Sequence, residues 1–224
     1  MSWRGAGGRL CAVVLLAVVP ITLNCSARPA ATVTVVSKQE IRFDAVAQAG
    51  RFTRGAMPGY HALVFREGAS AGSALLVADV TDEQVLDALT ALGAVPGDAL
   101  GLDTWDDRNN RASQAPDRTI EGPAIEVLIR IPGRGPPVPL ATLLTDSGRR
   151  GLDLRFGGHR ANIPAWRSGC IVCLFSCPGS KIGNAAYTIR DYVDGTARFG
   201  VRPGVLPEDG GRVEVVVRFP GPEG

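Results

Sequence analysis

The chain is organised around one stretch, Ser168-Gly169-Cys170-Ile171-Val172-Cys173-Leu174-Phe175-Ser176-Cys177-Pro178-Gly179. This stretch holds three of the five cysteines, at the spacing C-x2-C-x3-C-P, and the other two, Cys11 and Cys25, lie near the N-terminus. Three thiols this close together can close a disulfide, hold a metal ion or exchange electrons. The stretch is therefore the first candidate for a functional site.

Sulfur chemistry leaves three alternatives open for Cys170, Cys173 and Cys177. An iron–sulfur cluster needs four thiolates, and the bacterial ferredoxin run C-x2-C-x2-C-x3-C-P begins with a cysteine that this chain lacks. A structural zinc site also needs four ligands, and His159 is the candidate for the fourth. In an oxidising compartment, two of the thiols would form a disulfide, either Cys170–Cys173 or Cys173–Cys177. One thiol would then be left over. Neither metal site is favoured over a disulfide.

The first 27 residues have the three-part pattern of a secretory signal peptide. Arg4 and Arg9 precede an apolar run over 10–23, and small and polar residues follow as far as Ala27. The run is short for a bilayer span. We expect a protein exported to the periplasm or cell envelope, with an uncleaved N-terminal anchor or lipidation of Cys25 as the alternatives that would hold it at a membrane.

The charge balance argues against a nucleic-acid partner. The chain has 24 basic and 22 acidic residues, and removal of Arg4 and Arg9 with the leader (24 − 2) leaves 22 of each. No basic block remains that would bind phosphates. With three Tyr, three Trp and seven Phe, aromatic platforms for single strands are not expected either. With nucleic acid excluded, we expect any partner to be another protein of the cell envelope.

The rest of the chain predicts an α+β fold that is predominantly β. One helix is expected over 82–92, because Thr81 and Gln84 have the spacing of a capping box and apolar residues follow at helical intervals. His61 lies inside an apolar strand and is expected to be packed. Short, mostly antiparallel strands are predicted over 32–36, 41–46, 60–65, 74–78, 124–131, 152–156 and 212–219, with the cysteines in a loop.

Residues 132–139 form the strongest break in the chain, with four prolines and two glycines. Such a composition supports neither a helix nor a central strand. The break divides an N-terminal part, 32–131, from a C-terminal part, 140–219, which carries the cysteines. It is either a boundary or a stiff hairpin connection.

The cysteine stretch belongs to a longer similarity. Together with Gly157-Gly158, 181–192, His61–Phe65 and Leu89–Gly97, it resembles the YdjY-like family of exported bacterial proteins over most of residues 32–219. The resemblance implies an envelope protein of uncharacterised function, sometimes described as ferredoxin-like. It implies no catalytic residues.

Two function hypotheses follow from these observations. In the first, an exported protein transfers electrons or thiol equivalents to an envelope partner through its loop of Cys170, Cys173 and Cys177. In the second, the protein is a structural or binding module of the cell envelope, and a disulfide or zinc staples the same loop. An enzyme is the less favoured class, because no G-x-S-x-G, H-E-x-x-H or P-loop pattern occurs.

Overall fold

The structure is a computed structural model of the 224-residue chain, and it describes residues 31–54, 59–98 and 100–220. The expected leader, residues 1–27, and the candidate lipidation residue Cys25 lie outside the described residues. The described residues belong to one compact unit. None of the helices within them is both long and apolar enough to cross a bilayer.

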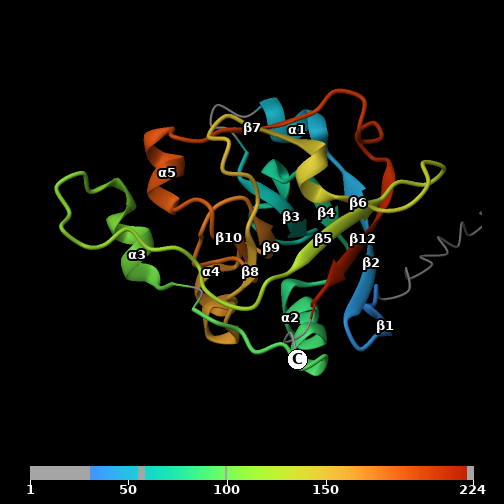
Figure 1. Cartoon of the computed structure of the whole chain (residues 1–224), viewed down its shortest axis with the longest axis horizontal. Helices are drawn as coiled ribbons and strands as arrows, with labels where there is room; N and C mark the ends of the chain where they lie inside the picture. The colour runs from blue at the N-terminus through green and yellow to red at the C-terminus, as the bar shows by residue number, and fades with distance from the viewer. Residues whose placement is uncertain (1–30, 55–58, 99, 221–224) are drawn as a thin grey trace, which may run out of the picture. The chain divides into compact units, whose positions relative to one another are not determined.

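A curled, mixed sheet dominates the fold (Figure 1), in the order β6-β5-β12-β2-β4-β3-β9-β10-β8, with β1 paired to β2 beside this path and β7 paired to β11 separately. Most pairs are antiparallel, as predicted, whereas β3–β4 and β9–β10 are parallel. The strands are β1 (Thr34–Ser37), β2 (Glu40–Ala47), β3 (His61–Phe65), β4 (Leu76–Ala78), β5 (Glu126–Arg130), β6 (Val138–Pro139), β7 (Leu144–Asp146), β8 (Leu154–Phe156), β9 (Cys170–Cys173), β10 (Ile182–Asn184), β11 (Phe199–Val201) and β12 (Arg212–Arg218).

Strands β2 and β12 show why these residues form a sheet. In β2, Ile41, Phe43 and Ala45 alternate with more exposed residues and are at most 4% exposed. The facing strand β12 repeats the pattern with Val213 and Val215, which pair with Ala45 and Phe43. A period of two sends one set of side chains to one face of a strand, so both strands bury the same face in the core.

The sheet curls so far that β8, the last strand in its order, lies beside residues 123–125, just before β5. The amide of Ile125 donates to the carbonyl of Leu154 at 2.9 Å, and the amide of Phe156 donates to the carbonyl of Pro123 at 3.0 Å. Gly122 has a φ of +143° at this junction, and a Cβ there would collide with the carbonyl of Phe156. Glycine is needed because only it combines this φ with so close an approach.

Residues 131–137 connect β5 to β6 as an antiparallel hairpin, with Leu128 opposite Pro139 and Ile129 opposite Val138. Proline is tolerated in β6 because this strand is at the edge of the sheet. The chain on both sides of the hairpin contributes to the same sheet, since β12 lies between β5 and β2.

The prediction of one well-defined helix was wrong, because the described residues contain five α-helices. Four of them have only four to six residues, too few to show the helical period in a sequence. The α-helices are α1 (Ala49–Arg54), α2 (Asp82–Ala91), α3 (Leu102–Asp106), α4 (Ile163–Trp166) and α5 (Ile189–Asp194), and the short 3₁₀ helices are η1 (Ala71–Ser73), η2 (Asp107–Asn109), η3 (Leu140–Leu143) and η4 (Arg160–Asn162).

Helix α2 has the ends that its sequence predicts. The hydroxyl of Thr81 accepts from the amide of Gln84 at 3.0 Å, and the side chain of Gln84 accepts from the amide of Thr81 at 2.8 Å. After the helix, Gly93 takes a left-handed conformation with a φ of +89°. The capping box and the glycine stop were therefore both readable from the sequence.

We expect the substitution Thr81→Ala to lower the free energy of unfolding by about 1 kcal/mol, because it leaves the amide of Gln84 without its cap. Thr90→Ala is the matched control. Thr90 is exposed in the last turn of the same helix, and its hydroxyl donates only to the carbonyl of Leu86. Urea unfolding of both variants measures the difference, and an equal loss in the two would show that the cap contributes nothing of its own.

Candidate functional site

The cysteines are buried in the fold, and two of them lie in a strand rather than in the loop that the sequence predicted. Cys170 and Cys173 begin and end β9, which pairs with β3 on one side and β10 on the other. Only Cys177 lies beyond the strand, in the connection to β10. The exposed fractions of Cys170, Cys173 and Cys177 are 1%, 0% and 4%. The loop prediction was wrong for the first two, because Ile171 and Val172 make a short, wholly buried strand between them.

The pairing of β9 with β3 is irregular. Residues three apart on a regular strand point to opposite faces, so Cys170 and Cys173 would normally be separated. The register between β9 and β3 shifts on both sides of Leu63, and such bulges re-aim side chains. The neighbouring thiols of Cys170 and Cys177 both affect the pKa of Cys173, so the three side chains lie near one another. The Sγ of Cys173 also donates to the carbonyl of Tyr60 at 3.5 Å.

All three cysteines are free thiols in the structure. Burial raises the pKa of Cys173 well above its usual value, and hydrogen bonding to Cys170 raises this pKa further. The pKa of Cys177 is also raised well above its usual value, first by its hydrogen bond to Cys173 and then by burial, while the charge of Lys181 opposes the rise. With these raised pKa values, Cys173 and Cys177 stay protonated at neutral pH. The thiolate, not the thiol, is the form of cysteine that acts as a nucleophile and metal ligand, so both residues are unreactive in this state.

Aromatic rings cover the cluster on the side of β3. The rings of Tyr60 and His61 lie 3.9 Å apart between centroids, and those of Tyr60 and Tyr192 lie 4.5 Å apart. His61 faces Cys173 across the β3–β9 pairing and is 5% exposed, which confirms the expectation of a packed residue. Burial lowers the pKa of His61 from 6.5 to about 4, so its ring is neutral at physiological pH.

A buried ion pair lies near Cys177. Lys181 is 1% exposed, and its Nζ lies 3.0 Å from Oδ2 of Asp82 at the start of α2. The same ammonium group donates to the carbonyl of Gly179 at 3.2 Å. The pair thus ties the connection that carries Cys177 to α2. This pair was not predicted, because no local pattern in the sequence shows that a lysine between a glycine turn and a strand is buried.

His159 does not join the cysteines. It precedes η4 and is exposed, whereas the three sulfurs are buried. Within residues 31–54, 59–98 and 100–220, no group of three or more His, Cys, Asp or Glu side chains is placed to hold a metal ion. The donor set that a structural zinc site or a four-thiolate iron–sulfur cluster requires is therefore not assembled around Cys170, Cys173 and Cys177.

Similarity to known proteins covers the same residues. The family model described as the YdjY domain matches residues 33–218. A curated relative, the uncharacterized protein YdjY of Escherichia coli (strain K12), is 27% identical over 150 residues, which are 66% of this chain and 62% of the relative. The chain thus spans about three fifths of the length of that relative. No solved structure matches. Since the family model covers the sheet, α2 and the cysteine cluster together, the chain belongs to the YdjY domain family.

Proposed function

We propose that the protein is a non-enzymatic module of the cell envelope, in which the cluster of Cys170, Cys173 and Cys177 stabilises the core. The observation that supports this proposal most is the burial of all three sulfurs in the middle of the sheet. A cysteine that transfers electrons or thiol equivalents needs partial exposure and a lowered pKa. The pKa values of Cys173 and Cys177 are instead raised, which favours a structural role over transfer.

If the protein is exported, the cluster can undergo one reaction, the formation of a disulfide. In an oxidising compartment, two of the thiols lose two electrons and two protons and form an S–S bond, while a disulfide of an envelope thiol oxidase accepts them and becomes a dithiol. Cys173 is the expected common partner, because it lies between the other two cysteines in the sequence and both neighbouring thiols affect its pKa. Oxidation has to precede burial, during folding. For so short a loop, the cross-link stabilises the folded state by about 2 kcal/mol.

We expect protein recovered from the envelope, with free thiols blocked during lysis, to contain Cys173 in a disulfide with Cys170 or Cys177. Peptide mapping by mass spectrometry assigns the pair and separates it from Cys11 and Cys25. The variant Cys173→Ala should contain no disulfide between the remaining two, whereas Cys170→Ala should keep Cys173–Cys177. A mixed disulfide between one of these residues and another protein would instead favour thiol transfer.

A further inference from the structure

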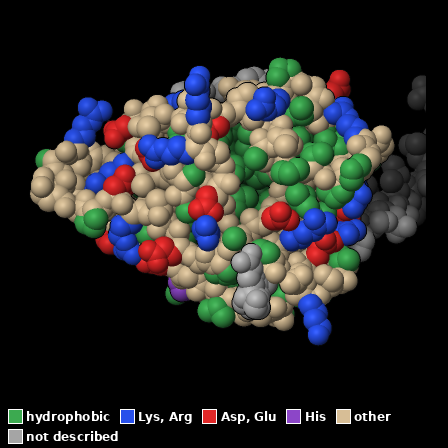
Figure 2. Space-filling view, in the orientation of Figure 1, with side chains coloured by type: hydrophobic (Ala, Val, Ile, Leu, Met, Phe, Trp, Pro, Cys, Tyr) green, Lys and Arg blue, Asp and Glu red, His purple; other side chains and the backbone are tan. Residues whose placement is uncertain are grey.

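A pocket of about 350 Å³ opens between the β5–β6 hairpin, η3 and residues 204–205, away from the cysteine cluster. Figure 2 shows hydrophobic side chains gathered on the face where Figure 1 places β5 and β6. Aliphatic side chains make up most of the wall: Ile129, Ile131, Val138, Leu143 and Val205. The volume is at the lower end of the range for small-molecule sites, about 300–1,000 Å³.

The floor of the pocket is preformed. Ile129 and Leu143 are 1% and 2% exposed and belong to the hydrophobic core, and Val138 and Val205 pack against that core from the rim. These residues come from β5, η3, β6 and the chain before β12, so four separate segments fix the shape. An apolar ligand would enter without rearranging the core.

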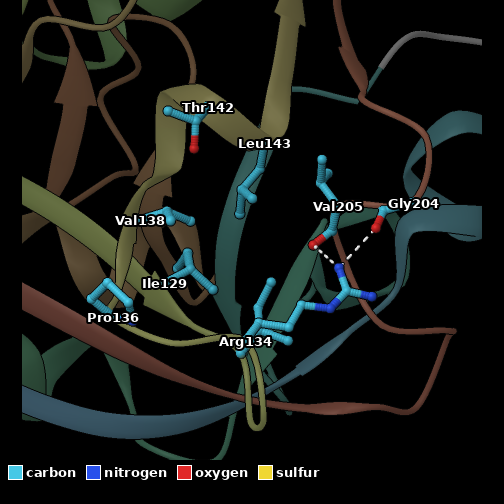
Figure 3. Close-up of a pocket in the computed structure, with 9 residues that line it drawn as sticks. Ile129, Arg134, Pro136, Val138, Thr142, Leu143, Gly204 and Val205 are labelled. Atoms are coloured by element: carbon cyan, nitrogen blue, oxygen red, sulfur yellow. Dashed lines mark hydrogen bonds between the residues drawn. The ribbon is translucent and has the colours of Figure 1, made fainter.

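One cation lies at the edge of this apolar pocket. In Figure 3 the guanidinium of Arg134 points towards Gly204 and Val205, beside the aliphatic side chains. Its Nη1 donates to the carbonyls of Gly204 and Val205 at 2.8 and 3.0 Å, which fixes the side chain. A guanidinium has five N–H donors, and both of these bonds use Nη1. The N–H groups of Nε and Nη2 therefore remain available to a ligand.

Among the residues that the structure describes, no acid forms an ion pair with Arg134. The residues that line the pocket include neither Asp nor Glu, and among the described ion pairs none involves Arg134. A fixed cation with free donors at the mouth of an apolar pocket is complementary to a molecule that has one anionic end and one apolar end. Carboxylate fits the planar guanidinium best, because the two groups can form parallel hydrogen bonds.

We propose that this pocket binds a small amphipathic carboxylate, such as a medium-chain fatty acid, with the alkyl chain against Ile129 and Leu143 and the carboxylate at Arg134. This inference rests on the proposed function as a module without catalytic activity, and it names the ligand class of that module. It does not depend on the oxidation state of Cys170, Cys173 and Cys177.

The test measures binding of octanoate, 1-octanol and acetate to the protein by isothermal titration calorimetry at fixed ionic strength. We expect octanoate to bind more tightly than 1-octanol and acetate not to bind measurably. Arg134→Gln should weaken octanoate about tenfold and leave 1-octanol unchanged, because only the carboxylate uses the guanidinium. Arg167→Gln is the matched control and should change neither, since Arg167 is exposed and does not line the pocket.

A second variant, Val138→Phe, tests the apolar part of the pocket by filling it with a larger side chain. Val138→Phe should abolish binding of both octanoate and 1-octanol, and a thermal melt checks that the variant is folded. Equal octanoate affinity in the wild type, Arg134→Gln and Val138→Phe would overturn the proposal, as would a wild type that binds no octanoate. Either failure leaves the disulfide map of Cys173 unchanged, so it is distinguishable from failure of the proposed function.

Discussion

Asp82→Asn is expected to lower the free energy of unfolding by about 3–5 kcal/mol, because it leaves the ammonium group of Lys181 buried without a counter-charge. The side chain of Lys181 is 1% exposed, and that of Asp82 is 11% exposed. Water therefore cannot replace the lost carboxylate around Nζ. The remaining hydrogen bond to the carbonyl of Gly179 satisfies one donor but supplies no charge. Urea unfolding of the wild type and the variant gives the difference.

Glu83→Gln is the control for this substitution. Glu83 is the next residue in the first turn of α2, and it pairs with Arg160 at the surface, where its side chain is 51% exposed. Removing that charge should cost less than about 1 kcal/mol. Equal losses in Asp82→Asn and Glu83→Gln would mean that Asp82 acts only through the helix end and not through Lys181.

The double variant Lys181→Met/Asp82→Asn separates the charge from the packing. Replacing both members of a buried pair is often close to neutral, whereas removing one is costly. We expect the double variant to be more stable than Asp82→Asn alone. Strictly additive losses from Lys181→Met and Asp82→Asn would contradict a direct coupling between the two side chains.

The second large effect is a dependence of stability on pH that comes from His61. Burial lowers the pKa of this residue to about 4 in the folded protein, from 6.5 when exposed. Between these two values the unfolded chain takes up a proton that the folded chain does not. The contribution of His61 to stability is therefore fully present above pH 6.5 and is lost as the pH falls towards 4, by about 3 kcal/mol in total.

Unfolding of the wild type and His61→Gln, followed from pH 7.5 to pH 4, isolates this effect. Carboxylates contribute to acid denaturation in both proteins, so the difference between the two curves reports His61. We expect the wild type to lose about 3 kcal/mol more than the variant over this range. His159→Gln, at an exposed position, should follow the wild type. Parallel curves for the wild type and His61→Gln would show that the ring is protonated without cost in the folded state.

Much of the fold was readable from local pattern. The strands β2, β5 and β12 and helix α2 each combine a clear period with recognisable ends, and each was predicted close to its observed bounds. Helix α5 was missed although Thr188 and Asp191 form a capping box and Gly195 ends the helix in a left-handed conformation. Its six residues are too few for an apolar period, so the caps were the only signal.

The candidate site was only partly readable. The spacing of Cys170, Cys173 and Cys177 shows that the thiols are close in the chain. The burial of Cys170 and Cys173, however, depends on the pairing of β9 with β3, a strand more than a hundred residues earlier. Burial of Lys181 likewise depends on Asp82, which is distant in the sequence. Such properties come from pairing between distant parts of the chain, and local patterns in a single sequence do not reveal this pairing. The pocket at Arg134 has the same origin, because its wall includes Val205 and Leu143 from separate segments.

A structural role for the thiols of Cys170, Cys173 and Cys177 requires that they stay buried in the folded protein. Alkylation of the reduced, folded protein with iodoacetamide at pH 8, followed by peptide mapping, measures this protection residue by residue. We expect all three residues to react more than about a thousandfold more slowly than in the unfolded chain, and to accelerate together as urea populates the open state. If one of them reacts within about tenfold of its unfolded rate while the protein stays folded, the cluster is accessible and the structural account is contradicted.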